Sequence, residues 1–174
     1  STGDAKKVLD DAYANGISVC LDLWVGHERH GFNYNDEYAI TAQLKAFEQD
    51  ILKYKDHPAL LMWAVGNEAD LFYKNFRVWN AVEDIAKMIK ELDPNHPTMT
   101  VTAGIDPAEV FMIQTSCPSI DILGVNTYGA VSYTYLRAHE TREDLVCRLL
   151  LETKKNTYPT QLNLTRSLLR PFRN

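Results

Sequence analysis

Residues 60–70, LLMWAVGNEAD, run an apolar segment directly into a glycine, an amide and two acids. Pro58 stands just before this segment and does not allow a helix to continue into it. The apolar run over residues 59–65 is also shorter than a typical buried helix. The pattern therefore predicts a strand covered on both faces, with Asn67 and Glu68 at its carboxyl end.

Helical and strand-like segments alternate on both sides of this strand. Apolar residues recur at steps of three and four over residues 36–54 and 76–92, which is typical of amphipathic helices. Strands are predicted over residues 17–25, 59–65, 98–104 and 120–128, and helices over residues 4–16, 36–54, 76–92 and 106–116. Such an alternation is what a parallel sheet with crossover helices produces.

Two α/β architectures fit that order. A doubly wound nucleotide-binding sheet normally carries a glycine-rich phosphate loop after its first strand, and neither GxGxxG nor GxxxxGK[ST] occurs. A (β/α)8 barrel places its chemistry at the carboxyl ends of its strands, and those ends carry His27, Asn67, Glu68, Asn126 and Tyr128. Four strands cannot close an eight-stranded barrel of roughly 250 residues. The predicted fold class is thus α/β, a partial (β/α)8 TIM barrel, and the chain is expected to be a fragment.

Glu68 is the residue of this set with the most obvious chemistry. Low-dielectric walls around the mouth of a buried strand favour the protonated form of a carboxyl group, which suits a general acid. Asn67 beside it offers both a donor and an acceptor to a sugar hydroxyl. The competing interpretation is that Glu68 is a helix-capping or loop acid at the surface.

A resemblance to a known family favours the catalytic interpretation. Residues 57–70, HPALLMWAVGNEAD, resemble the fourth-strand signature of the large clan of retaining glycosidases built on (β/α)8 barrels, in which an Asn-Glu pair ends the strand. Residues 19–36, VCLDLWVGHERHGFNYND, together with residues 51–68 are similar to the barrel domain of family 2 glycoside hydrolases, which include β-galactosidase and β-glucuronidase. The resemblance runs over about residues 5–135 and implies roughly strands three to six of the barrel.

The same resemblance implies roles for single residues. Glu68 would be the acid/base, and Asn67 would hold the 2-hydroxyl of the sugar. Tyr128 resembles the tyrosine of the clan that hydrogen-bonds the nucleophile, and Asn126 ends the same strand. His27 would belong to the rim of the sugar pocket, although a loop histidine bonded to backbone is the alternative. The HERH run over residues 27–30 lacks the spacing of HExxH and a third ligand, so a zinc site is not favoured.

The sequence shows no candidate for the nucleophilic carboxylate of a retaining mechanism. Retaining glycosidases need a nucleophilic carboxylate about 5 Å from the acid/base, and in this clan it ends the seventh strand. The acids beyond Tyr128 do not end an apolar strand; they are Glu140, Glu143, Asp144 and Glu152. Residues 138–174 carry a net charge of +3 against −8 for residues 1–137, and residues 130–174 contain no glycine. We expect a partial barrel domain over residues 1–137 and an atypical tail over residues 138–174, from a frame-shifted or alternatively terminated reading of a longer gene.

Composition excludes several other functions. A net charge of −5 argues against a nucleic-acid or anionic-membrane partner, and no apolar run approaches the roughly 20 residues of a membrane-spanning helix. The three cysteines are widely spaced and indicate buried free thiols rather than disulfides or a metal site. No cofactor or metal is expected. The compartment stays open: a removed leader would fit a secreted or periplasmic protein, and a cytoplasmic protein is the alternative.

Other side chains receive simpler expectations. The tryptophans Trp24, Trp63 and Trp79 are expected in the core rather than as sugar-stacking platforms. Asp22 lies within a strand and is expected to meet a neighbour inside the barrel, because an unpaired buried carboxylate is costly. No role follows for Glu28 or Asp70.

Two functions remain. The first is a retaining O-glycosyl hydrolase of the family 2 kind, whose nucleophile lies outside this chain. The second is a non-catalytic fragment that binds carbohydrate weakly. In either case an open half barrel leaves edges and apolar faces uncovered, so self-association is expected.

Overall fold

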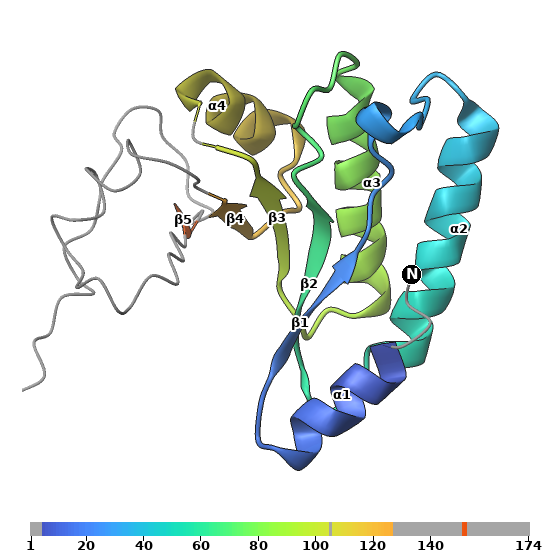
Figure 1. Cartoon of the computed structure of the whole chain (residues 1–174), viewed down its shortest axis with the longest axis vertical. Coiled ribbons are helices and arrows are strands. Elements are labelled where there is room, and N and C mark those ends of the chain that lie inside the picture. The colour runs from blue at the N-terminus through green and yellow to red at the C-terminus, as the bar shows by residue number, and fades with distance from the viewer. Residues whose placement is uncertain (1–4, 105, 127–150, 153–174) are drawn as a thin grey trace, which may run out of the picture.

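The computed structural model describes residues 5–104, 106–126 and 151–152 (Figure 1). Four strands form a parallel sheet in the order of the chain, and each is followed by a helix or helical crossover except the last. The elements are α1 (Ala5–Ala14), β1 (Val19–Leu23), the 3-10 helix η2 (Glu28–His30), α2 (Glu37–Tyr54), β2 (Leu60–Asn67), α3 (Arg77–Leu92), β3 (Thr98–Thr102), α4 (Pro107–Ser116) and β4 (Ile122–Val125). A two-residue strand, β5 (Leu151–Glu152), pairs antiparallel with β4 and was not predicted.

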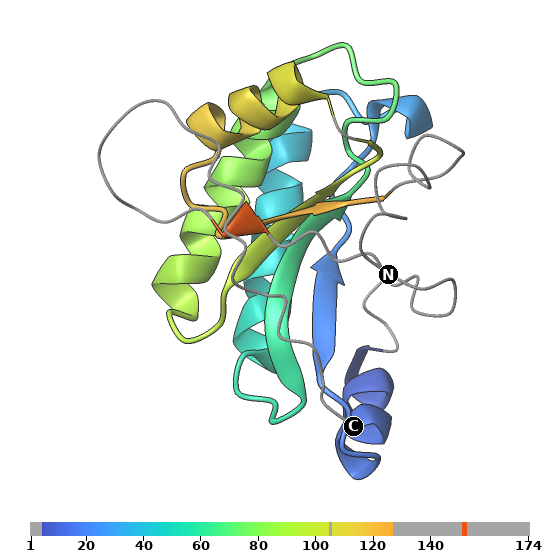
Figure 2. The same ribbon diagram turned by 90° about the vertical axis from the view of Figure 1, so that its left-hand side faces the viewer.

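The helices gather on one face of the sheet. Helix α3 packs on β2 and β3, and α2 and α4 lie beside α3 on the same side (Figures 1 and 2). Leu23, Trp63 and Ile85 are among the fully buried side chains of this layer. Within the described residues no helix covers the opposite face, which in a closed barrel is the interior. The predicted partial (β/α)8 barrel with crossover helices is confirmed.

Local sequence signals explain where the helices begin and end. Asp36 caps α2 by accepting hydrogen bonds from the backbone N–H groups of Tyr38 and Ala39 at 3.0 and 3.2 Å. Asp106 caps α4 in the same way through Ala108, 2.8 Å away. Gly16 follows α1 in a left-handed conformation with φ 68°, which glycine adopts without strain.

The strand boundaries differ from the predicted ones because hydrogen bonding, not hydropathy, sets them. Strand β2 continues past its apolar run to Asn67, which pairs with Val101 across an irregularity in the β2–β3 register. The other three strands are shorter than predicted, and the end of the last predicted strand, with Tyr128, lies outside the described residues.

The cysteines were expected to be buried free thiols, and the described ones match this expectation in part. Cys117 is buried, and its Sγ lies 3.2 Å from the carbonyl oxygen of Trp79. Cys20 is only partly buried, with its Sγ 3.3 Å from Met99 Sδ. Cys147 lies outside the described residues. Among the described helices, none combines the length and the apolar character needed to cross a membrane.

Candidate active site at the carboxyl edge of the sheet

Parallel pairing brings the polar ends of β2 and β4 together at one edge of the sheet. Asn126 follows β4, and its Nδ2 donates to Asn67 Oδ1 at 2.9 Å and to Glu68 Oε1 at 2.8 Å. All three side chains are partly buried. Residues almost 60 positions apart in the chain thus form one hydrogen-bonded cluster, as the parallel-sheet prediction requires.

The backbone around Glu68 turns sharply to present its side chain. Gly66 and Glu68 both have positive φ, 75° and 54°. The glycine is required because a Cβ at position 66 would come within 3.1 Å of the Val25 side chain. Glu68 has no such freedom, so its left-handed conformation costs roughly 1–3 kcal/mol and must be held by its surroundings. Part of that restraint is the hydrogen bond from Glu68 N to Val101 O, 2.7 Å long.

Two acids without a predicted role hold the loop that follows Glu68. Both carboxylate oxygens of Asp70 lie within reach of the backbone N–H of Ala103, at 3.0 and 2.8 Å, so Asp70 ties the loop to the end of β3. Glu28 Oε2 accepts from the backbone N–H groups of Lys74 and Asn75 at 2.5 and 2.9 Å, which ties the same loop to the segment after β1. Burial raises the pKa of Asp70, and the hydrogen bond from the Ala103 backbone opposes that rise. These acids therefore anchor the loop from both neighbouring strands.

His27 lies beside this cluster as a buried imidazole. Only 2% of the residue is exposed, and its ring stacks on that of Trp24 with the centroids 4.9 Å apart and the planes 10° from parallel. Burial lowers the pKa of His27, helped by the charges of Arg29 and His30, while the Asn67 backbone and the Glu68 charge act in the opposite direction. Neither ring nitrogen has a hydrogen bond of normal geometry to a described residue, although the Asn67 backbone lies close enough to act on the pKa of the ring as a hydrogen-bond partner. His27 is thus a buried ring beside the backbone of Asn67 and close to Glu68.

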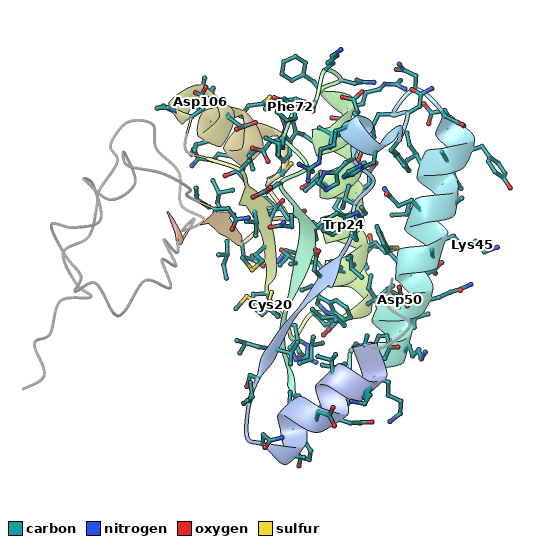
Figure 3. The ribbon with its side chains drawn as sticks, viewed as in Figure 1. Cys20, Trp24, Lys45, Asp50, Phe72 and Asp106 are labelled. Atoms are coloured by element: carbon teal, nitrogen blue, oxygen red, sulfur yellow. The ribbon has the colours of Figure 1, made fainter. Side chains whose placement is uncertain are left out.

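Trp24 corrects the expectation for the tryptophans. Trp63 and Trp79 are in the core, with 0% and 1% exposed, but Trp24 is 51% exposed. Figure 3 shows it at the upper end of β1. The exposure of Trp24 follows from the alternation of side chains along β1, because Leu21 and Leu23 face the helices and position 24 falls on the other face.

Asp22 shares that open face with Trp24. Its Oδ1 is buried without a hydrogen-bond partner among the described residues, but the Gly66 backbone acts on the carboxyl group as a hydrogen-bond partner, so the expected neighbour is found for only part of the group. Burial raises the pKa of Asp22 to about 6, against a smaller opposing effect of the Gly66 backbone.

The structure thus places four of the five predicted site residues. Glu68, Asn67 and Asn126 are in direct contact, and His27 is close enough to feel the charge of Glu68. Tyr128 lies outside the described residues. A surface hollow of about 520 Å³ adjoins the loop on the side of Glu28 and Arg77, and Glu68 is not among its lining residues. Within residues 5–104 and 106–126, no group of three or more potential ligands could hold a metal ion.

Comparison with known proteins connects this site to a family. Residues 7–161 match the family model described as glycosyl hydrolases family 2, TIM barrel domain. The β-glucuronidase of Felis catus is 29% identical over 97 residues, and that of Sus scrofa is 27% identical over 97 residues. In both cases the match covers 56% of this chain but only 14% of the relative, so the chain spans about a seventh of the length of these relatives.

Two solved structures share the fold at low identity. The β-D-glucuronidase of Dictyoglomus thermophilum superposes with a TM-score of 0.55 and 20% identity, covering 74% of this chain and 24% of the other. The β-galactosidase of the psychrophilic Marinomonas ef1 gives a TM-score of 0.53 and 11% identity, covering 74% and 33%. The family match extends over most of the residues that build the sheet and its carboxyl edge, and the chain therefore belongs to family 2 of the glycosyl hydrolases, within its TIM barrel domain.

Proposed function

We propose that this chain carries the acid/base half of a retaining O-glycosyl hydrolase active site. The observation that supports it most is the Asn67–Glu68–Asn126 cluster, in which the side-chain amide of Asn126 donates both to the Glu68 carboxyl group and to Asn67 at the carboxyl edge of a barrel sheet. Barrel enzymes hold their chemistry at that edge. The substrate is a carbohydrate, contacted by Asn67, Asn126, His27 and Tyr128 with Glu68 at the glycosidic oxygen.

The hydrogen bonds assign a task to each oxygen and amide. Asn126 Nδ2 binds Glu68 Oε1, so Oε2 is the oxygen that would deliver a proton to the leaving group. Asn67 Oδ1 accepts from the same amide, which directs the NH2 group of Asn67 elsewhere and makes it the donor to a sugar hydroxyl. Glu68 would donate its proton as the glycosidic bond breaks and would then take a proton from water in the second step.

The retaining reaction also needs a nucleophile. Among the described acids, Asp70 is the one closest in sequence to Glu68, but its carboxylate is engaged with Ala103. The acids after the neighbouring strands are engaged too, because Glu28 accepts from the N–H groups of Lys74 and Asn75 and Asp106 caps α4. The proposal therefore places the nucleophile outside the described residues. This same observation favours the second candidate, a non-catalytic fragment that binds carbohydrate.

The relatives direct the choice of substrate. β-Glucuronidases and a β-galactosidase are among the proteins to which this chain is similar, which supports β-linked glycosides as the first compounds to test. A panel of nitrophenyl β-glycosides, including the glucuronide and the galactoside, is incubated with the full chain, its Glu68→Gln variant and a Glu48→Gln control. Glu48 is an exposed acid on α2, away from the site.

The outcomes separate the two candidates. Turnover that Glu68→Gln lowers by about 10²- to 10⁴-fold, and that Glu48→Gln leaves unchanged, supports the hydrolase. Saturable binding without turnover in a folded sample favours the carbohydrate-binding fragment. A folded sample with neither turnover nor binding contradicts both.

A further inference from the structure

We infer that Thr100 is a positioning residue for the acid/base, because its buried hydroxyl supports a bulge in β2 that turns Asn67 and Glu68 toward the site. Thr100 acts through the backbone of β2, since its hydroxyl donates to the carbonyl oxygen of Val65 at 2.8 Å. Its importance for catalysis rests on the proposed function, whereas the bulge and its support belong to the sheet itself.

Strand β2 contains one extra residue just before its carboxyl end. Ala64 pairs with Met99 on β3, and the next pair is Asn67 with Val101. Strand β2 therefore advances by three residues while β3 advances by two, which is the arrangement of a β-bulge. Gly66 lies inside the bulge with a φ of 75°, a conformation that glycine adopts without strain.

The extra residue decides which face of the sheet Asn67 occupies. In a regular register Asn67 would stand opposite Thr102, which is buried on the helical side, and would share its face. With the bulge it stands opposite Val101, on the face away from the helices. Asn126 lies on that same face, because it follows Val125, the partner of Thr102 on β4. The bulge thus allows Asn126 to bond both Asn67 and Glu68.

Thr100 supports this bulge from the neighbouring strand. It is 1% exposed, and its bond to Val65 O is buried. Val65 is the first of the two residues that stand opposite Thr100, so the side-chain bond joins the strands where their register is interrupted. Beyond the bulge, the Glu68 N–H donates to Val101 O at 2.7 Å. Loss of the Thr100 hydroxyl would remove a donor from a buried carbonyl oxygen and favour rearrangement of the bulge.

Thr98 provides a matched control on the same strand. Its side chain is also fully buried on the helical side, but its Oγ1 donates to Ser119 O at 2.7 Å and not to β2. Thr98→Val and Thr100→Val each replace a buried hydroxyl by a methyl group of similar shape, so both should lower stability. Only Thr100→Val removes the bond to the bulge. Thr100→Ser keeps a hydroxyl and should restore the site.

NMR of the full chain tests the role of Thr100 without a ligand. The Glu68 N–H should exchange at least about fivefold faster in Thr100→Val than in Thr98→Val, because its bond to Val101 depends on the bulge. Nuclear Overhauser effects between the side chains of Asn126 and Glu68 should weaken in Thr100→Val alone. Thr100→Ser should keep both signals. Any turnover of the nitrophenyl glycosides should fall in Thr100→Val and recover in Thr100→Ser.

Equal exchange at Glu68 in Thr98→Val and Thr100→Val, with the Asn126 signals kept in both, overturns the role of Thr100. Should Thr100→Val not fold, the unchanged chain decides: a slowly exchanging hydroxyl proton on Thr100 supports the bond to Val65, and a rapidly exchanging one overturns it. Absence of both turnover and glycoside binding in the unchanged chain contradicts the proposed function, whereas the exchange results still decide whether Thr100 holds the bulge.

Discussion

Asp22 illustrates how a single residue can lower stability in a site that is incomplete within the described part of the chain. Its buried Oδ1 has no hydrogen-bond partner there, and burial raises its pKa to about 6 from an ordinary value of 3.8. The folded chain therefore holds a proton on Asp22 that the unfolded chain has already released between these two values. Ionisation of this group makes the folded state less stable as the pH rises through that window.

An Asp22→Asn substitution should remove this dependence. The variant and the unchanged chain are expected to be equally stable below pH 4, and the variant to become the more stable one as the pH rises from 4 to about 6, with the difference levelling off above pH 6 at no more than about 3 kcal/mol. Urea unfolding at a series of pH values measures the difference. Burial also raises the pKa of Glu109, to about 7, so the difference between the two chains isolates Asp22. A Glu48→Gln control should show a constant difference, and a constant difference for Asp22→Asn would contradict the account.

The residues of the site were predictable to unequal degrees. Asn67, Glu68, Asn126 and His27 could be identified because each lies at or just past the carboxyl end of a predicted strand, and parallel strands bring those ends to one edge. Trp24 was wrongly assigned to the core because hydropathy does not reveal which face of a strand is covered. The anchoring roles of Asp70 and Glu28 depend on backbone N–H groups at least 33 residues away, which sequence spacing cannot reveal.

At the scale of elements, the β2–α3 loop is a separately anchored unit. Asp70 joins it to the end of β3 and Glu28 joins it to the segment after β1. Gly66 near the end of β2 and Glu68 at the start of the loop are both left-handed, a conformation that only surrounding contacts can maintain at Glu68. The two acids and the Glu68 N–H bond to Val101 supply those contacts.

Removing an anchor should loosen the loop locally. In Asp70→Ala, the backbone N–H of Ala103 loses its acceptor. The free energy of unfolding of this variant should therefore be about 1–2 kcal/mol lower than that of the unchanged chain. In Glu28→Ala, the N–H groups of Lys74 and Asn75 lose theirs. Native-state hydrogen exchange should show faster exchange at these positions, and in both variants at Glu68.

The control for the anchors is Glu48→Gln, which should leave exchange in the loop unchanged. Unchanged exchange at Glu68 in both anchor variants would show that the acids do not hold the β2–α3 loop. The helices need no such test, because Asp36 and Asp106 cap α2 and α4 through hydrogen bonds to backbone N–H groups of the first helical turn.

At the scale of the whole molecule, the described sheet is an open part of a barrel. The outer edge of β1 has no strand partner among the described residues, and the face away from the helices exposes Trp24 and parts of Met99, Val101 and Ile122. The alternating pattern of strands and helices made this architecture predictable. The division into residues 1–137 and a tail over residues 138–174 stays a prediction, because most of that tail lies outside the described residues.

The open face and edge should lead the chain to self-associate. Sedimentation velocity over a range of concentrations is expected to show a concentration-dependent shift toward dimers or larger species. Ile122→Lys places a charge on the open face and should weaken association, whereas Tyr38→Lys places it on the helical side and should not. A monomer at every concentration would mean that the open face is covered within one chain.

The central claim is that Glu68 meets the glycosidic oxygen of a bound carbohydrate. The most direct measurement is the side-chain carboxyl ¹³C resonance of Glu68, assigned by its loss in Glu68→Gln, during a titration of the full chain with methyl β-glucuronide and methyl β-galactoside. The account predicts that this resonance moves saturably with at least one glycoside while that of Glu48 stays fixed. A glycoside that saturates the chain and leaves the Glu68 resonance unmoved would contradict it.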